Sequence, residues 1–582
     1  MLAALVPGVQ IDGTWLDAEA AAKRGLSVSE RVLSDGARRV TLSNCSGKTV
    51  YPEELGWRKS GCDDFDVGGL KVYLESWQMA SPCGVRNWDD EPFDYSAGYL
   101  HNCVSTPSDF HPGERGRFLS DHQCCFRRPD GRMRLYGFTT GRDRFGHFRM
   151  RLAEKGVAEF LALCACDRAE LAPGAKIVSE RLVTMDGFDT EELFGRFADL
   201  WAKESGARRR FDAPIGWCSW YYYFEKVSLA AVIENMDWFN AHREEGFDRV
   251  RFIQLDDGYE VALGDWFVPN ERFPGGLKRF ADEVKARGFT PAVWVGPFMV
   301  EENARILKEH PDWMVKGADG RPASPLSWRQ DHKIYVLDGT HPAVQNHLRN
   351  VFRTLRGYGI EYVKLDFCMI ASSIPGARYH DPTATRAQAL RRAFEAIREG
   401  FGEDGFILGC TAPFGSLVGI VDAMRSSTDI TPYWQGEGHQ YAEAPNVPNV
   451  CRNIINHNYM NGRLWINDPD TLIVRDDSTK LTQSEVELWA EAVTRVGGSL
   501  LLSDRFSTLS SARLPLVKKV LERTGSYKGT FPADRWERTY PTAWRSVRDE
   551  RPSVARFDFD DSHAVLVQRD DRNGDRPPLR VR

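Results

Sequence analysis

Two aspartates in this sequence each follow a short hydrophobic run and have a cationic residue close by. Asp366 lies near the end of the run 362–367, in which Lys364 precedes it with one residue between. In a strand, alternate side chains share a face, so Lys364 and Asp366 point the same way. Pairing with a lysine keeps a buried carboxylate ionised, as a nucleophile requires. A purely structural Lys–Asp pair at a strand end is the alternative interpretation.

Asp429 ends the segment 424–429 of the sixth predicted strand unit, which also contains Arg425. Two carboxylates on opposite sides of a pocket are what cleavage of a glycosidic bond requires. A separation of about 5–5.5 Å between them would predict retention of configuration, and about 6.5–9.5 Å would predict inversion. Taken alone, Asp429 is explained equally well as the N-cap of a following helix.

Further polar and aromatic residues lie at the ends of other predicted strands. Asp256 and Asp257 are adjacent, and such carboxylates reach different partners or accept hydrogen bonds from several hydroxyl groups. An Asp-Gly turn with a solvated charge is the alternative. Trp220 and Trp294 are the aromatic candidates for stacking on a sugar ring. A metal site is not expected, because no histidine stands at a short fixed offset; His332 is the one loop candidate.

Eight strand-like runs carry these residues, and helical stretches separate several of the runs. Strands that alternate with helices predict parallel pairing, and eight such units predict a (β/α)8 TIM barrel over residues 212–511. The active-site face of such a barrel lies at the carboxyl ends of its strands, where the polar clusters fall. The predicted strands are 215–220, 250–255, 291–295, 362–367, 406–410, 422–426, 464–467 and 499–503, and the predicted helices include 229–239, 277–287, 344–356 and 386–400.

The segments that flank this barrel have a different character. Residues 1–185 contain many short β-type runs broken by Gly, Pro, Asn and Asp, which predict an N-terminal β-sandwich. Residues 186–211 show helical spacing of apolar side chains and predict a linker helix. Residues 512–582 end in a β-type alternation and predict a small C-terminal antiparallel β domain.

The composition excludes several classes of protein. A content of 42% hydrophobic and 27% charged residues is typical of globular chains. The net charge of −6, without a long basic run, argues against a nucleic-acid partner. No uninterrupted apolar run of about 18 residues is present, so no membrane span is expected. The cysteines are scattered and the N-terminus lacks a basic segment before its apolar stretch, so a reduced cytoplasmic protein is expected.

Five motifs between residues 214 and 504 together resemble glycoside hydrolase family 36 (clan D), and more broadly the clan that also holds families 27 and 31. The resemblance implies a retaining, exo-acting enzyme of the α-galactosidase type, with a β-sandwich, a catalytic barrel and a C-terminal β domain. The motifs are Gly-Trp-Cys-Ser-Trp-Tyr at 216–221, Leu-Asp-Asp-Gly-Tyr at 255–259, Lys-Leu-Asp-Phe at 364–367, Arg-Ser-Ser-Thr-Asp at 425–429 and Leu-Trp-Ile-Asn-Asp-Pro-Asp at 464–470.

The resemblance also implies a role for particular residues. Asp366 would be the nucleophile and Asp429 the general acid/base. The residues implied around the sugar are Asp256 and Asp257 at its distal hydroxyls, Lys364 and Arg425 beside the two catalytic carboxylates, and Cys410 near its 2-position. A buried structural thiol is the alternative for Cys410. No metal or organic cofactor is implied. The partner would be a small α-galactoside or oligosaccharide, and a homo-oligomer is expected because relatives often associate.

The sequence departs from the family pattern in three places, which leaves the exact sugar open. Tyr259 replaces the usual tryptophan, residues 412–416 replace a glycine-rich stretch, and 77–79 only loosely resemble the segment that reaches into the pocket. Three alternatives therefore remain: an α-N-acetylgalactosaminidase, a galactosyl transferase of the raffinose-synthase type, and a sugar-binding protein without catalysis.

Overall fold

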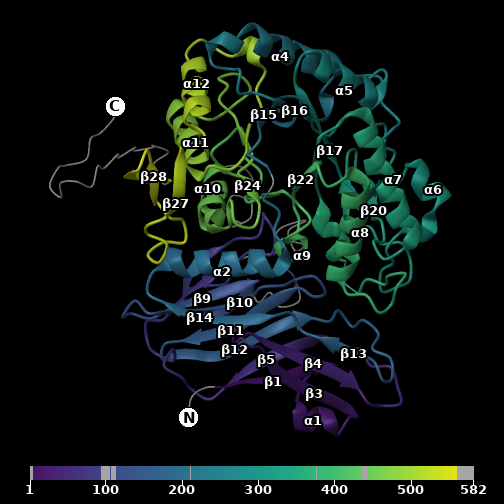
Figure 1. Cartoon of the computed structure of the whole chain (residues 1–582), viewed down its shortest axis with the longest axis vertical. Helices are drawn as coiled ribbons and strands as arrows, with labels where there is room; N and C mark the ends of the chain where they lie inside the picture. The colour runs from purple at the N-terminus through teal and green to yellow at the C-terminus, as the bar shows by residue number, and fades with distance from the viewer. Residues whose placement is uncertain are drawn as a thin grey trace, which may run out of the picture.

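Antiparallel sheets, a closed parallel sheet and a small antiparallel sheet follow one another along the chain (Figure 1). The computed structural model describes residues 4–93, 105, 113–209, 211–374, 376–435 and 444–559. This succession confirms the fold class predicted from the sequence, whereas the predicted domain boundaries stay a prediction. None of the helices in the described part of the chain is long and apolar enough to cross a membrane.

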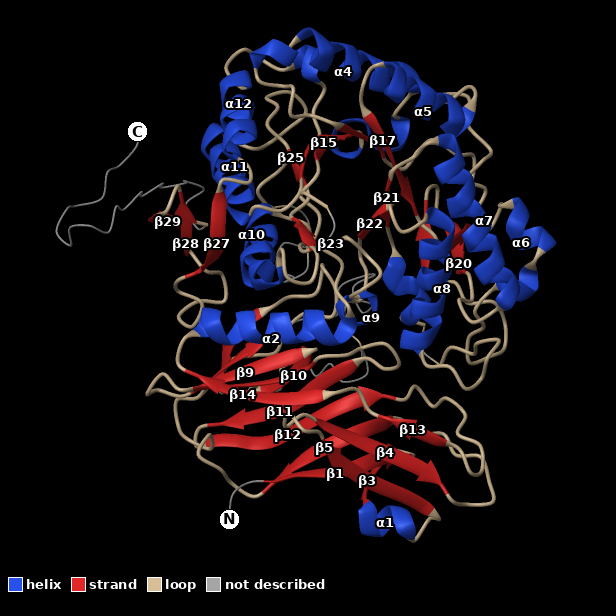
Figure 2. Cartoon of the chain, viewed as in Figure 1, coloured by secondary structure: helices blue, strands red, loops and turns tan. Residues whose placement is uncertain are grey.

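Two antiparallel sheets form the N-terminal part and share one core (Figure 2). In β4 (Arg38–Asn44), Val40 and Leu42 are buried while their neighbours are less so, which is the alternation of a strand with one inner face. Phe148 of one sheet and Phe138 of the other meet in this core, with ring centroids 5.2 Å apart. The two sheets are therefore a sandwich.

The first sheet contains, in spatial order, β2 (Thr14–Asp17), β1 (Ala4–Ile11), β5 (Glu54–Ser60), β12 (Gly156–Ala165), β11 (Gly146–Ala153) and β8 (Arg117–Asp121). The second contains β13 (Lys176–Val178), β4, β14 (Leu182–Gly187), β10 (Met133–Phe138), β9 (Gln123–Arg127), β6 (Lys71–Leu74) and β7 (Gly84–Asn87), with β3 (Leu26–Val32) paired to β4. The short helix α1 (Ala18–Ala22) joins β2 to β3.

Helix α2 (Thr190–Ser205) lies between the sandwich and the central part of the molecule (Figure 2). Asp189 caps its first turn by accepting the Glu191 and Glu192 N–H groups, and the helix ends at Gly206, whose φ of 73° suits a left-handed C-cap. Its Trp201 packs edge-on against Trp465 of the central part, with centroids 6.2 Å apart. The helix predicted within 186–211 is thus present and packs against both the sandwich and the central part.

The central sheet contains nine short parallel strands, and all eight predicted strands take part in it. Its end strands, β24 and β25, follow each other in the chain with only Pro469 and Asp470 between them, so the sheet closes on itself. In spatial order the strands are β24 (Ile466–Asp468), β23 (Ala423–Arg425), β22 (Phe406–Gly409), β21 (Tyr362–Leu365), β17 (Thr290–Val295), β16 (Phe252–Leu255), β15 (Ile215–Cys218), β26 (Leu500–Leu502) and β25 (Thr471–Leu472).

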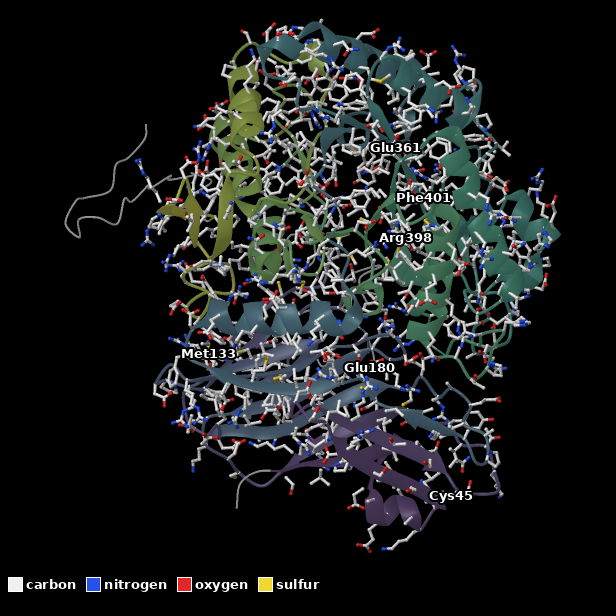
Figure 3. The ribbon with its side chains drawn as sticks, in the orientation of Figure 1. Cys45, Met133, Glu180, Glu361, Arg398 and Phe401 are labelled. Atoms are coloured by element: carbon white, nitrogen blue, oxygen red, sulfur yellow. The ribbon has the colours of Figure 1, made fainter. Side chains whose placement is uncertain are left out.

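Helices surround this sheet, as expected for a barrel (Figure 1). On α8 (Arg386–Phe401), Arg398 is directed inward and its Nη2 donates to Asp422 Oδ2 at 2.5 Å (Figure 3). The other helices of the central part are α3 (Trp220–Tyr223), α4 (Leu229–Ala241), α5 (Gly276–Ala286), α6 (Arg305–Glu309), α7 (Pro342–Tyr358), α9 (Phe414–Leu417), α10 (Val447–Asn456) and α11 (Gln483–Val496).

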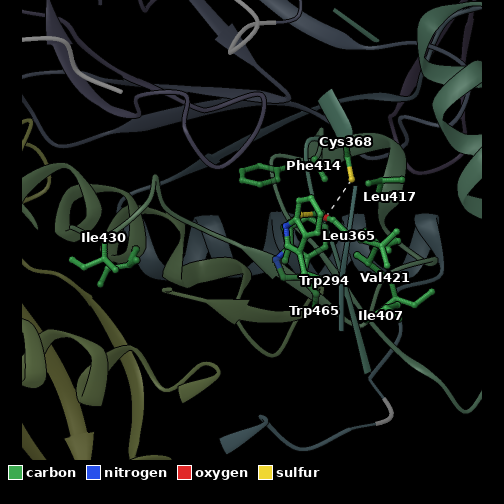
Figure 4. Packing of buried hydrophobic residues seen from close by; sticks show 14 of the residues in the cluster. Trp294, Leu365, Cys368, Ile407, Phe414, Leu417, Val421, Ile430 and Trp465 are labelled. Carbon is green, nitrogen blue, oxygen red and sulfur yellow. Dashed lines mark hydrogen bonds between the residues drawn. The ribbon is translucent and has the colours of Figure 1, made fainter. Parts of the chain in front are cut away.

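Large apolar side chains pack around the carboxyl ends of β17 and β21 (Figure 4). Trp294, Leu365 and Trp465 are all buried here, and the Cys368 thiol donates to the Leu365 carbonyl at 3.3 Å. Close-packed interiors resist deformation, so this core fixes the directions in which the strand ends present their polar residues.

An insertion between β17 and α7 adds a small antiparallel sheet beside the strand ends. It contains β18 (Met299–Glu301), β20 (His332–Val336) and β19 (Leu326–Trp328) in that order. The turn from β19 to β20 has three consecutive non-glycine residues with positive φ, Arg329, Gln330 and Asp331 at 37°, 52° and 62°. Such backbone is costly and is found where a side chain has to be held in a special direction.

The C-terminal part begins with a helix that the sequence did not predict, α12 (Leu514–Arg523). It is followed by an antiparallel sheet of β27 (Tyr527–Pro532), β28 (Ala543–Arg548) and β29 (Arg551–Arg556). The predicted β domain over 512–582 is therefore observed as a helix and a small sheet, and its residues 560–582 lie outside the described part of the chain.

Candidate active site

A cavity of about 160 Å³ opens at the carboxyl ends of the barrel strands. Two larger hollows among the described residues, of about 610 and 750 Å³, are lined by none of the carboxylates at these strand ends. The smaller cavity is lined by Gln78, Met79, Ala80, Trp220, Tyr221, Asp256, Asp257, Trp294, Leu326, Ser327, Trp328, Lys364, Asp366, Phe367, Met369, Thr411, Thr428 and Asp429. It thus brings both predicted catalytic aspartates together with a segment of the N-terminal domain.

Asp366 lies immediately after β21 and is surrounded by hydrogen-bond donors. Its Oδ1 accepts the Phe367 N–H at 2.7 Å and the Thr411 hydroxyl at 2.8 Å, and its Oδ2 accepts the Trp294 indole N–H at 3.1 Å. Lys364 Nζ is 3.7 Å from Oδ2. Burial is the largest single influence and raises the pKa, but Lys364 and the three hydrogen bonds together lower the pKa below its usual value. Asp366 is therefore held as a carboxylate.

Lys364 also contacts Asp256, which ends β16. Lys364 Nζ lies 3.0 Å from Asp256 Oδ2, and the same oxygen accepts the Gln254 side-chain amide at 3.0 Å. Burial, the largest influence, lowers the pKa of Lys364, but Asp256 and Asp366 outweigh it and raise the pKa well above its usual value. The lysine is thus a fixed cation that links two strand ends.

Asp257 faces the other way, toward the inserted sheet. Its Oδ2 accepts the Trp328 indole N–H at 3.2 Å, and its Oδ1 pairs with the Arg329 guanidinium. Arg329 also pairs with the buried Glu260, whose pKa is raised to about 8, mainly by burial and then by the charge of Asp257. The adjacent aspartates Asp256 and Asp257 therefore reach different partners, one of the two outcomes predicted from the sequence.

Arg425, at the end of β23, is the centre of a carboxylate cluster. Its Nη1 is 3.0 Å from Asp429 Oδ1 and 3.0 Å from Asp470 Oδ2, and its Nε is 3.0 Å from Asp468 Oδ2. Arg425 is buried and does not line the cavity itself. Asp470 has a pKa raised to about 7, mainly by burial. A single guanidinium is thus shared among three carboxyl groups.

Asp429 is the member of this cluster that reaches the cavity. Its side chain is 47% exposed, and this exposed part faces the cavity. Burial is the main influence that raises its pKa, and Asp366 adds to it, whereas Arg425 and Lys364 act in the opposite sense. Because the net shift is upward, Asp429 holds a proton to higher pH than an ordinary aspartate.

The remaining predicted site residues differ in their access to the cavity. Trp220 and Trp294 both line it, and Trp294 adds the hydrogen bond to the predicted nucleophile. Cys410 is buried and does not line the cavity; it packs against Met79 and Ala80, which do. His332 lies in the inserted sheet with Nδ1 2.6 Å from Glu301 Oε1, away from the cavity lining.

Three residues of the site were not found from the sequence. Trp328 and Arg329 lie in the insertion, with no motif around them, and contact an aspartate distant in the chain. Thr411 follows Cys410 directly and has a φ of 44°, an unfavourable conformation for a β-branched residue that only the folded backbone reveals. The folded chain, rather than local sequence, brings Trp328 and Thr411 to the cavity lining and Arg329 to Asp257.

Comparison with known proteins identifies the relatives of this chain. Residues 216–396 match the Melibiase family model. Alpha-galactosidase 2 of Pediococcus pentosaceus is 29% identical over 151 residues, 25% of this chain and 20% of that protein, so the match spans about a fifth of that curated relative.

Two solved structures share the fold. The α-galactosidase TtGalA of Thermus thermophilus superposes with a TM-score of 0.67 at 23% identity, over 90% of this chain and 98% of that chain. The GH36 α-galactosidase AgaA of Geobacillus stearothermophilus gives 0.60 at 13% identity, over 98% of this chain and 80% of that chain. Residues 216–396 of this chain are thus similar to the Melibiase family, and its fold is that of the GH36 α-galactosidase AgaA, the resemblance that its motifs predicted.

Proposed function

We propose that this protein is a retaining exo-α-galactosidase, with Asp366 as nucleophile and Asp429 as general acid/base. One observation carries the proposal: both carboxyl groups line the same small cavity, and their pKa values are shifted in opposite directions. Two carboxyl groups with separated pKa values can act as an ionised nucleophile and a protonated acid at the same pH.

In the first step, Asp429 gives its proton to the glycosidic oxygen while an Asp366 oxygen attacks the anomeric carbon. The bond from that carbon to the oxygen breaks, and its electron pair leaves with the protonated aglycone. Lys364 and the donors from Thr411 and Trp294 hold the Asp366 carboxylate in one orientation. The product of this step is a glycosyl ester on Asp366.

In the second step, Asp429 acts as the base. Formation of the ester removes the negative charge of Asp366, which is one of the influences that raise the pKa of Asp429. The pKa of Asp429 therefore falls once Asp429 has given up its proton. Asp429 stays ionised as a result, and it can accept a proton from the attacking water. The water attacks the anomeric carbon, Asp366 is released, and two inversions restore the α configuration.

The cavity supports a single terminal sugar as the substrate unit. Its volume of about 160 Å³ is below the usual range of drug-sized ligand pockets, about 300–1,000 Å³. Asp256 and Asp257 offer carboxylate oxygens to sugar hydroxyls, and Trp220 and Trp328 supply aromatic surface. TtGalA, which shares the fold, is described in complex with p-nitrophenyl α-D-galactopyranoside, which favours galactose as the sugar.

The packing of Cys410 favours galactose over its N-acetylated analogue. The family resemblance places this cysteine near the sugar 2-position, and Met79 and Ala80 pack directly against it. An acetamido group at that position would have to displace these buried side chains, and close-packed walls accept added atoms only at a cost.

Turnover of a panel of p-nitrophenyl α- and β-glycosides tests the proposal. We expect release from the α-galactoside, with α-galactose as the first product by NMR, and a loss of roughly 10³-fold or more in Asp366→Ala. Asp319→Ala, in an exposed turn between β18 and β19, is the matched control and should retain wild-type turnover. Substantial activity in Asp366→Ala would show that another group is the nucleophile.

Chemical rescue separates a nucleophile from a structural aspartate. Asp366→Gly with added azide should form β-galactosyl azide, because the small anion attacks from the space that the carboxylate vacates and inverts the centre once. A high concentration of acceptor sugar in the wild-type assay distinguishes transfer from hydrolysis. Turnover of the N-acetylated substrate instead of the galactoside would identify an α-N-acetylgalactosaminidase. Absence of turnover on every glycoside would favour a sugar-binding protein without catalysis.

A further inference from the structure

We infer that Glu75 and His457 form a buried ion pair that positions one wall of the cavity relative to the turn that carries Asp429. This wall consists of Gln78, Met79 and Ala80 and belongs to the N-terminal domain. The inference rests on the proposed function, because the wall lines the cavity that is proposed to hold the sugar. Neither residue lines the cavity, so both act as positioning residues through their neighbours.

Both ring nitrogens of His457 face hydrogen-bond acceptors. Nδ1 lies 2.7 Å from the Ser426 carbonyl oxygen, and Nε2 lies 2.9 Å from Glu75 Oε1. A neutral imidazole has only one N–H, so two acceptors at these distances require the doubly protonated ring. The side chains of His457 and Glu75 are both fully buried, where a charge persists only beside its counter-ion.

The Glu75 carboxylate has donors on both of its oxygens. Oε1 also accepts the Ser76 N–H at 2.8 Å, and Oε2 accepts the Tyr459 hydroxyl at 2.8 Å and the Tyr73 hydroxyl at 3.1 Å. Burial is the largest influence on the pKa of Glu75 and raises it, but His457 and these hydrogen bonds outweigh burial and lower the pKa. The carboxylate is thus charged although it has no access to solvent.

A proton, and not a metal ion, joins the two residues. Cys83 lies beside them, and the three possible ligand atoms are all within 4.8 Å of one another. Two ligands about 2.0–2.1 Å from a tetrahedral zinc ion would be roughly 3.3 Å apart. The observed separation of 2.9 Å between Nε2 and Oε1 is the length of a charge-assisted hydrogen bond.

On one side, the pair fixes the segment that forms the pocket wall. Glu75 begins the stretch in which Gln78, Met79 and Ala80 line the cavity. The same stretch is held again by Asn453, whose side-chain amide donates to the Met79 carbonyl at 2.8 Å. Asn453 and His457 both belong to the barrel. The barrel therefore fixes the position of a wall that belongs to the N-terminal domain.

On the other side, the pair reaches the segment of the proposed acid/base. Ser426, whose carbonyl accepts from His457, follows Arg425 directly and precedes Asp429 by one short turn. The Ser426 N–H donates to the Asp468 carbonyl at 2.8 Å, so this turn is held at both its N–H and its C=O. Loss of the His457 charge would therefore loosen the wall and the acid/base turn together.

Steady-state kinetics of His457→Gln and Glu75→Gln test this role, with each variant assayed well below its Tm. We expect KM for the α-galactoside and Ki for galactose to rise by about tenfold in each variant, the effect of one lost contact to the sugar. The double variant should be no worse than either single, because neither charge is then left unpaired. A lowered Tm with unchanged KM and Ki would overturn the inference. His310→Gln, which removes an imidazole stacked on Trp313, is the control.

The wild-type protein provides a test that does not depend on variants that fold. In the 15N NMR spectrum of histidine-labelled protein, one ring should show both nitrogens protonated across about pH 5 to 9, and that signal should be absent in His457→Gln. A neutral His457, or stoichiometric zinc retained on purification, would overturn the ion pair. Absence of turnover by the wild type on any glycoside would instead remove the proposed function, and the NMR result would still stand.

Discussion

The guanidinium Nη1 of Arg425 lies 3.0 Å from Asp429 Oδ1, yet the arginine does not hold Asp429 as an ordinary ion pair would. The same nitrogen is 3.0 Å from Asp470, and Nε is 3.0 Å from Asp468. Its single charge is divided among three carboxyl groups, so each is stabilised as an anion less than an undivided pair would allow. This sharing, together with burial, is why the pKa of Asp429 is raised beside an arginine.

Replacement of Asp470 should move the alkaline limb of the pH profile. In Asp470→Asn, Arg425 has one carboxylate fewer to neutralise and Asp429 loses a negative neighbour, and both changes lower the pKa of Asp429. Since Asp429 has to be protonated for the first step, the alkaline limb of kcat/KM should shift to lower pH. Rates measured over about pH 4 to 10 check this, with the exposed Asp476→Asn as control. An unmoved limb would mean that Asp429 is not the acid.

Replacement of Lys364 should move the acid limb of the pH profile of kcat/KM. Lys364 is the main influence that lowers the pKa of Asp366 against burial, so Lys364→Gln raises that pKa. Because Asp366 has to be ionised, the acid limb of kcat/KM should move to higher pH. The buried Asp256 also loses its cation, and loss of one partner of a buried pair costs about 3–5 kcal/mol of unfolding free energy. Chemical denaturation measures this loss; Lys364→Arg should recover part of both effects.

The meeting of the two proposed catalytic aspartates in one cavity was predictable from the sequence, because both lie close to the ends of predicted strands. Asp366 directly follows β21 and Asp429 lies in the short turn after β23, and a parallel barrel gathers the carboxyl ends of its strands at one face. The pairing of Lys364 with Asp366 was likewise predictable, because residues two apart in a strand share a face. These features depend on spacing within a few residues, which the sequence shows directly.

Contacts between distant segments could not be predicted in this way. Arg329 reaches Asp257 from an insertion whose sheet depends on a strained turn, and nothing near either residue indicates the other. The pairing of Glu75 with His457 joins two domains, and each residue alone has no motif. The helix α12 was missed because residues 512–582 were interpreted as a β domain, and the amphipathic pattern of the helix becomes decisive only when it packs on α11.

The free energy of unfolding should depend on pH through Glu260. Its pKa is about 8 in the folded protein, above the value of about 4.3 for an unfolded chain. A raised pKa contributes stability that is complete below the unfolded value and is lost as pH rises through the folded value. Glu260→Gln removes this dependence, so its Tm relative to wild type should increase between about pH 5 and 9. Glu302→Gln, at an exposed position of the insertion between β17 and α7, should show no such trend.

Gly258 should tolerate no side chain, because it holds Asp257 in place at a crowded turn. Its φ is 119°, and an added Cβ would lie 2.7 Å from the Glu225 carbonyl oxygen and 2.8 Å from the Glu225 Cα. Gly246 provides the matched control, since its φ of 100° is similarly unfavourable for alanine but no atom lies within 4 Å of its added Cβ.

Strain from positive φ costs about 1–3 kcal/mol and should affect both alanine variants, whereas the clash affects Gly258→Ala alone. To relieve it the backbone has to move, and Asp257 moves away from Arg329 and from the cavity. We therefore expect both variants to lower Tm, but only Gly258→Ala to raise KM for the α-galactoside, by about tenfold for a weakened hydrogen bond to the sugar. Equal KM values in the two variants would show that Asp257 does not contact the substrate, and its part would then be limited to fixing Arg329.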